Sequence, residues 1–244
     1  MAAKLRQITT AALPSLMAYS LLLFDYDGTL CDSRQAIRYS LQQFFQTYNL
    51  PAPPEADVQR TIELGLSAPV TLQVLQPTAT PEQITEWVPL YRGIYAEQGE
   101  PLVQPFPGAY EVVAQAAAQG LMPVVISNKG SRVLEASLAR FELLPFFSLL
   151  IGDGSFPDKQ LALKPSPMIF QQIIQPHFPA VPLEEILMIG DTEADLLFAR
   201  NCGIDACWAS YGMGDAEACR ALEPRYELGA LADLATVLQS KSVV

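Results

Sequence analysis

The segment Leu21 to Phe24 restricts the fold more than any other part of the chain, because four apolar residues run directly into two carboxylates and a glycine. Such a run, bounded by turn-forming residues, is typical of a short strand buried on both faces. Asp25 and Asp27 follow, and residues two apart on an extended chain point to the same side. The pair can therefore address one ligand, and Mg²⁺ is the ligand that we expect. An ordinary Asp-Gly turn after a strand is the alternative that the pair alone leaves open.

Two further apolar runs predict buried strands that also end in polar side chains. The first ends at Ser127 and Asn128, whose neutral hydroxyl and amide groups can hold phosphate oxygens without adding charge. The second, Ile186 to Ile189, leads into the start of a helix that bears Asp191 and Asp195 one turn apart. Like charges at this spacing repel each other, although a helix N-terminus favours anions. A nearby cation would therefore stabilise this pair.

A single lysine completes the set of polar residues. Lys164 precedes Pro165, which disfavours helical backbone at the lysine, and Pro167 is placed to start a helix. We expect the ammonium group to lie beside the N-terminus of that helix, where it offsets neighbouring carboxylates.

Helices and strands alternate along most of the chain, and this order predicts the fold class. We expect strands at residues 21–24, 124–127, 148–151, 186–189, 204–208 and 225–228, and helices at 109–119, 131–141, 167–174, 193–202 and 231–238. Alternation of this kind predicts an α/β fold, a Rossmann-like parallel sheet with helices on both faces. Ligands of such sheets bind beyond the carboxyl ends of the strands, where all four polar segments lie.

A helical stretch interrupts the alternation. Residues 33–49 show helical spacing, and residues 56–99 read as further helices with breaks near Gly65 and at 77–81. We therefore divide the chain into an N-terminal extension (1–18), a core (19–32 and 105–244) and a helical insert (33–104).

Composition excludes several kinds of partner. The formal net charge is −11 and no cluster of Lys and Arg occurs, which argues against binding to nucleic acid or to an anionic membrane. No apolar segment approaches the roughly 18 residues needed to span a bilayer. The chain has four Cys without metal-binding spacing and one His, which argues against structural zinc. Free thiols favour a cytoplasmic location.

The four polar segments, in this order, resemble the motifs of the haloacid dehalogenase superfamily of phosphotransferases. Its Asp-x-Asp-Gly-Thr-Leu motif is matched at residues 25–30, its Ser/Thr-Asn pair at 127–128, its Lys-Pro pair at 164–165 and its Gly-Asp-x-x-x-Asp motif at 190–195. The resemblance covers nearly the whole chain after about Met17. The segments 106–108, 127–129, 152–153 and 164–165 look most like the phosphoglycolate phosphatase-like branch, which also contains phosphomutases and pyrophosphatases.

The resemblance implies a Mg²⁺-dependent phosphatase that acts on a small phosphorylated metabolite, with 2-phosphoglycolate as the best candidate. Asp25 would attack phosphorus and ligate Mg²⁺, while Asp27 would act as the general acid and base and contact the metal through its backbone carbonyl. Asp191 would be the third anchor of the metal, and Asp195 would orient Lys164 or a metal-bound water. Lys164 would offset the charge of the carboxylates.

Substrate contacts follow from the same resemblance. Ser127 and Asn128 would hold phosphoryl oxygens, and the helical insert would act as a cap that selects the substrate. Arg60, in a loop of this cap, would bind the other end of an anionic substrate. The alternative is that Arg60 is an exposed helix residue paired with Glu63.

Two other functions remain open at this stage. A phosphosugar mutase uses the same core, and a non-catalytic binding protein could keep the fold. The carboxylate of Asp27 favours phosphoryl transfer over carbon–halogen hydrolysis, since dehalogenase relatives lack it. We expect a monomer or a homodimer.

Overall fold

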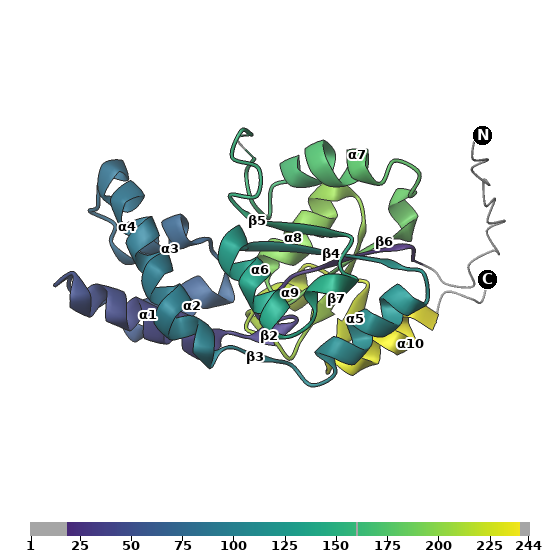
Figure 1. The fold of residues 1–244 in the computed structure, drawn as a ribbon, viewed down its shortest axis with the longest axis horizontal. Helices are drawn as coiled ribbons and strands as arrows, with labels where there is room; N and C mark the ends of the chain where they lie inside the picture. The colour runs from purple at the N-terminus through teal and green to yellow at the C-terminus, as the bar shows by residue number, and fades with distance from the viewer. Residues whose placement is uncertain (1–18, 160, 240–244) are drawn as a thin grey trace, which may run out of the picture.

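The computed structural model describes residues 19–159 and 161–239, so the predicted N-terminal extension lies outside the described residues. Its centre is a six-stranded sheet in the order β5-β4-β1-β6-β7-β8, in which all neighbouring strands are parallel (Figure 1). The strands of this sheet are β1 (Leu21–Phe24), β4 (Met122–Gly130), β5 (Leu149–Asp153), β6 (Ile186–Gly190), β7 (Asp205–Ala209) and β8 (Tyr226–Leu228). The predicted α/β fold is confirmed, with strand ends displaced by a few residues.

The helices fall into two groups. Those of the sheet region are α5 (Ala109–Ala118), α6 (Ser131–Arg140), α7 (Gln175–His177), α8 (Glu193–Cys202), α9 (Ala216–Ala221) and α10 (Leu234–Gln239), with a π-helical segment at Phe170–Ile174. Those that precede β4 are α1 (Arg34–Thr47), α2 (Glu55–Glu63), α3 (Ala68–Leu75) and α4 (Pro81–Ile94), which continues into a π-helical turn, Tyr95–Gly99. Helix α9 was not predicted.

Both faces of β1 are buried, as the sequence predicts. Leu22 and Phe24 belong to a core shared with α5, α6 and α10, and Leu21 and Leu23 belong to a second core shared with α8 and the Phe170–Ile174 segment. All four side chains have no solvent exposure. Because alternate residues of a strand point to opposite faces, a run of four apolar residues contributes two side chains to the core on each face of the sheet.

The helices α1 to α4 form a group to one side of the sheet (Figure 1). The chain enters this group after β2 (Cys31–Asp32) and leaves it before β3 (Gln104–Pro105), and these two short strands pair antiparallel. The name helical insert is kept for residues 33–104, which contain these four helices. The pairing of β2 with β3 brings the two ends of this stretch side by side.

The helix after β6 has the predicted bounds, residues 193–202, but the expectation that it bears Asp191 was wrong. Asp191 lies before α8 and not on it, because Thr192 is the N-cap residue and the helix begins at Glu193. At this N-terminus Thr192 N–H and Oγ1 both donate to Asp195 Oδ2, at 3.0 and 2.8 Å. The backbone of Asp191 is therefore not helical, and its side chain can turn toward β1. In the part of the chain that the structure describes, no helix has the length and apolarity needed to cross a membrane.

Candidate active site

The predicted site residues gather at the carboxyl edge of three neighbouring strands. Asp25 follows β1, Ser127 and Asn128 lie toward the end of β4, and Asp191 follows β6. Because β1 lies between β4 and β6, these polar groups converge on one place. The polar residues therefore lie beyond the carboxyl ends of the strands, where parallel sheets bind their ligands.

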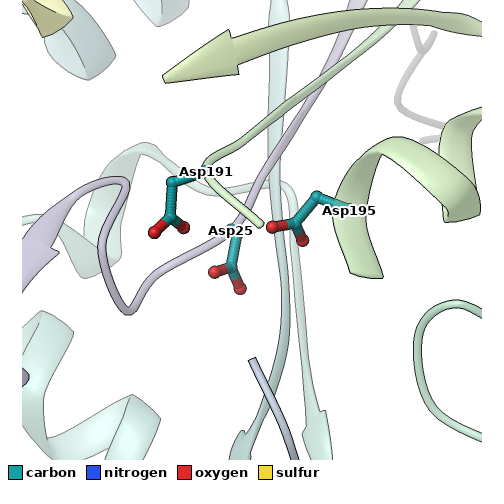
Figure 2. A group of neighbouring side chains, drawn as sticks. All are labelled: Asp25, Asp191 and Asp195. Atoms are coloured by element: carbon teal, nitrogen blue, oxygen red, sulfur yellow. The ribbon is translucent and has the colours of Figure 1, made fainter. Parts of the chain in front are cut away.

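Three carboxylates form the centre of the site. Oxygens of Asp25, Asp191 and Asp195 all lie within 4.8 Å of one another, and Figure 2 shows these side chains turned toward a shared space. The residues are 6%, 0% and 1% exposed, respectively. Lys164 Nζ donates to Asp25 Oδ1 at 2.7 Å and to Asp195 Oδ1 at 2.6 Å. One ammonium group therefore serves two of the three carboxylates.

The donor set fits a divalent cation. Three ionised carboxylates and one ammonium leave two negative charges, which one divalent ion would offset, and oxygen donors suit a hard ion such as Mg²⁺. Asp191 is oriented by hydrogen bonds from Met213 N–H to Oδ2 at 2.7 Å and from Thr29 Oγ1 to Oδ1 at 3.1 Å. Both oxygens of Asp195 are engaged by Lys164 and Thr192. Asp195 thus holds the charged Lys164, whereas the hydrogen bonds to Asp191 come from a neutral N–H and a neutral hydroxyl. Asp25 and Asp191 stay the predicted ligands.

Burial makes the negative charge of this cluster costly. It raises the pKa of Asp25 to about 7, against the opposing effect of the Lys164 ammonium. It also raises the pKa of Asp191 well above its usual range, and the nearby Asp195 and Asp25 add to this effect. Burial alone would lower the pKa of Lys164, but Asp195 and Asp25 outweigh it and raise that pKa to about 12. Lys164 therefore carries a positive charge. Its single charge offsets only part of the negative charge of the three carboxylates, so a further cation would stabilise them.

A cavity of about 110 Å³ opens between this edge of the sheet and the helical insert. Its polar lining from the sheet includes Asp25, Asp27, Ser127, Asn128, Lys129 and Lys164. Asp27 is held by an ion pair, because Lys129 Nζ donates to its Oδ1 at 3.1 Å. The predicted catalytic residues therefore face one enclosed space.

Ser127 and Asn128 differ in what they can offer a ligand. Ser127 Oγ accepts a hydrogen bond from Lys129 N–H at 3.2 Å and keeps its own hydrogen for donation. Asn128 Nδ2 donates to the carbonyl oxygens of Gly65 and Lys164, at 3.0 and 3.1 Å, which uses both amide hydrogens. Asn128 thus ties the helical insert to the Lys164 segment, and its predicted contact with a phosphoryl oxygen stays a prediction.

Arg60 is not among the residues that line the cavity. Its side chain is 49% exposed and lies 3.7 Å from Glu63, 3.7 Å from Glu193 and 4.0 Å from Asp215. This arrangement matches the alternative in which Arg60 is an exposed helix residue paired with Glu63. Its role in substrate binding stays a prediction that this geometry does not support.

Sequence reasoning assigned no role to two cavity cations, Lys129 and Arg92. Lys129 follows Ser127 and Asn128 at the same edge of the sheet, so the rule that located those residues applies to it as well. Arg92 lies in α4 and reaches the cavity only through the packing of the helical insert. The sequence around it has no turn, strand end or motif that marks a site.

The fold and the site together define a class: α/β enzymes with an acidic cluster at the carboxyl edge of a parallel sheet. The family model described as haloacid dehalogenase-like hydrolase matches residues 22–209, and the chain belongs to this family. This confirms the resemblance inferred from the motifs and the expectation of an enzyme.

Individual relatives agree with this family. The chain is 26% identical over 230 residues to a phosphoglycolate phosphatase of Vibrio cholerae, covering 91% of this chain and 99% of the relative. It is 26% identical over 226 residues to a pyrophosphatase, PpaX, of Halalkalibacterium halodurans, covering 93% and 100%. A solved structure from Haemophilus somnus, described as a predicted phosphoglycolate phosphatase, matches with a TM-score of 0.78 at 23% identity, over 90% of this chain and 98% of that one.

Metal binding should depend on pH in a defined direction. With the pKa of Asp25 raised to about 7, the folded protein holds a proton that the unfolded chain has released, so metal-free stability falls as pH rises toward 7. A metal ion needs the deprotonated ligand. We expect saturating MgCl₂ to raise the Tm by about 5 to 10 °C at pH 8 and by less than half as much at pH 5.5.

The measurement is thermal unfolding with and without MgCl₂, at constant ionic strength. Asp191→Asn is the control variant and should lose the Mg²⁺-induced rise at both pH values. An equal rise at both pH values in the wild-type protein would contradict the prediction.

Gly28 has no room for a side chain. Its φ is +84°, and a Cβ there would lie 2.0 Å from Asp191 Oδ2, which Met213 and Thr29 hold in place. Gly108 has the same φ of +84°, but a Cβ there would lie 3.7 Å from Ala232. Gly108→Ala is therefore a control for backbone strain alone, about 1–2 kcal/mol.

We expect Gly28→Ala to cost at least about 2 kcal/mol more than Gly108→Ala, and to abolish the response to Mg²⁺. Urea-induced unfolding of both variants gives the two free energies of unfolding. Similar losses in the two variants would show that Asp191 is not packed against Gly28.

Proposed function

We propose that this protein is a Mg²⁺-dependent phosphatase that hydrolyses a small phosphate monoester through an aspartyl-phosphate, with 2-phosphoglycolate as the best candidate substrate. The observation that carries this proposal is the cluster of Asp25, Asp191 and Asp195, of which Asp25 and Asp195 hold Lys164, beside a cavity that Asp25, Asp27 and Lys164 line. The names of the relatives support the same reaction class.

The first half of the reaction belongs to Asp25 and Asp27. The Asp25 carboxylate attacks phosphorus, so that a new O–P bond forms while the bond to the leaving oxygen breaks. For this step Asp27 is protonated, with the proton on the oxygen that Lys129 does not contact, and it gives this proton to the leaving oxygen, which departs as an alcohol. The covalent intermediate replaces one difficult displacement by two easier ones. In the first of them, a weak nucleophile is held in position next to phosphorus.

The second half restores the enzyme. Asp27, now a carboxylate, takes a proton from a water molecule that attacks the aspartyl-phosphate, and inorganic phosphate leaves Asp25. Lys164 stays charged beside Asp25 in both halves, since Asp195 fixes its ammonium group at 2.6 Å. Ser127 has a hydroxyl hydrogen available for a phosphoryl oxygen.

Asp25, Asp191 and the backbone carbonyl of Asp27 would hold Mg²⁺. When bound, the ion would neutralise part of the charge of the phosphoryl group and of the buried carboxylates.

The helical insert has the position of a cap. We propose a cap domain at residues 33–104 and a core at 19–32 and 105–244, with the β2–β3 ribbon at the junction. Side chains of the insert cover the cavity, and the Asn128 to Gly65 hydrogen bond joins insert and core beside it. Such a cover excludes water from the reacting groups.

We also propose that the enzyme works in the cytoplasm, as a monomer or a homodimer. Cys31, Cys202, Cys207 and Cys219 are all free thiols in the structure, and three of them are buried. Thiols in this state suit a reducing compartment.

The central test is phosphate release from a substrate panel. With MgCl₂, we expect hydrolysis of 2-phosphoglycolate well above that of the other monoesters, and none after chelation with EDTA. The panel includes pyrophosphate, because one relative is named a pyrophosphatase, and a hexose 1-phosphate. Isomerisation of the hexose phosphate without phosphate release would instead identify a mutase, and no turnover on any compound would favour a binding protein.

Single-turnover kinetics separate the two catalytic carboxylates. With p-nitrophenyl phosphate the leaving group needs little protonation, so Asp27→Asn should still form the aspartyl-phosphate but hydrolyse it about 10²–10⁴-fold more slowly. Rapid mixing should show a burst of one nitrophenolate per enzyme in Asp27→Asn, and no burst in Asp25→Asn. A burst in Asp25→Asn would refute the nucleophile assignment.

A further inference from the structure

The charged side chains that line the cavity divide into two sets. Asp25, Asp195 and Lys164 form one connected cluster, in which the lysine serves both carboxylates. Lys129 and Arg92 lie apart from that cluster, and the catalytic scheme above uses neither of them. A chain with a net charge of −11 places two cations here, so they need an explanation.

Lys129 is a nearly buried cation whose carboxylate partner is Asp27. Its side chain is 7% exposed, and its ammonium group donates to Asp27 Oδ1 at 3.1 Å and to the Tyr95 hydroxyl at 2.5 Å. It also lies 4.0 Å from the centroid of the Tyr95 ring. In the proposed first step Asp27 carries a proton, so the ammonium group no longer faces an ionised Asp27. An anionic group of the ligand would then be attracted strongly, because the local dielectric constant is low.

Arg92 comes from the opposite wall. Among the residues of the helical insert that line the cavity, Arg92 is the one that carries a charge. Its Nε is buried and has no hydrogen-bond partner in the described part of the chain, while its terminal NH2 group pairs with Asp153 outside the cavity lining. A Cβ on Gly130, the residue after Lys129, would lie 3.5 Å from this Nε. A buried guanidinium N–H without an acceptor is costly, and a ligand oxygen would satisfy it.

The position of the two cations relative to Asp27 indicates which end of the substrate they would meet. In the proposed reaction Asp27 protonates the leaving oxygen, so a cation in direct contact with Asp27 lies on the side of the leaving group. A phosphoryl group at Asp25 would then direct its leaving group toward Lys129 and Arg92.

We propose that Lys129 and Arg92 form a subsite for a second anionic group, carried by the leaving group a short distance from the phosphorus atom. This inference rests on the proposed function and defines its substrate class: small phosphate compounds whose leaving group bears a carboxylate or a further phosphate. A guanidinium and an ammonium group together suit either oxyanion. The subsite lies on the sheet edge and α4, and not at Arg60.

Binding of two non-hydrolysable probes tests the subsite without turnover. Phosphonoacetate carries a phosphonate and a carboxylate, and ethylphosphonate of similar size carries the phosphonate alone. By titration calorimetry in MgCl₂, we expect the wild-type protein to bind phosphonoacetate about 10- to 100-fold more tightly. In Lys129→Met and in Arg92→Met this preference should fall about tenfold. A ratio of two affinities on one sample does not depend on the folded fraction.

Two control variants separate ligand binding from other effects. Arg132→Met removes an exposed cation of α6 that does not line the cavity, and should keep the preference. Asp153→Asn removes the ion-pair partner of Arg92 but leaves the guanidinium, and should also keep it. Loss of the preference in Asp153→Asn to the same extent as in Arg92→Met would show that the ion pair acts structurally, and would overturn the proposal.

Other outcomes are equally decisive. A wild-type protein with no preference for phosphonoacetate overturns the subsite, even if it hydrolyses phosphate monoesters. Loss of the preference in Arg60→Met, but not in Lys129→Met or Arg92→Met, overturns it in favour of the α2 residue. A wild-type protein without phosphatase activity that shows the preference, with its loss in both variants, supports the subsite while the proposed function fails.

Discussion

The ammonium group of Lys164, held between Asp25 and Asp195, is the interaction on which the rest of the site depends. Three buried carboxylates within 4.8 Å of one another repel each other and lose hydration, and the lysine offsets only part of this cost. The remainder creates the demand for a divalent cation. The folded core therefore carries an uncompensated negative charge, which would favour the binding of a divalent ion.

The carboxyl edge of the sheet was predictable because its determinants are local. Four apolar residues before Asp25 define a buried strand, and the edge rule then brings Asp25, Ser127 and Asp191 together without knowledge of any contact. The N-cap role of Thr192 is local as well, and the predicted helix start at residue 193 agrees with it, whereas the expectation that the helix bears Asp191 was wrong. That difference matters, since a residue before the helix can turn toward β1.

The far wall of the cavity was not predictable in the same way. Arg92 and Tyr95 face the cavity because α4 packs against α1 and α3, and this packing depends on side-chain shapes spread over the whole helical insert. Arg60 shows the reverse case: a loop position suggested a ligand contact, yet neighbouring carboxylates of Glu63 and Glu193 hold its side chain outside the cavity. Charge alone does not tell which way a long side chain turns.

The β2–β3 ribbon has a consequence for how such a protein can diversify. The chain departs from the sheet at Cys31–Asp32 and returns beside the same point at Gln104–Pro105. Everything between these strands can be lengthened, shortened or replaced while strand order, the lysine and the acidic cluster keep their places. The stretch that encodes the four helices is thereby separate from the stretches that encode the sheet, the lysine and the acidic cluster.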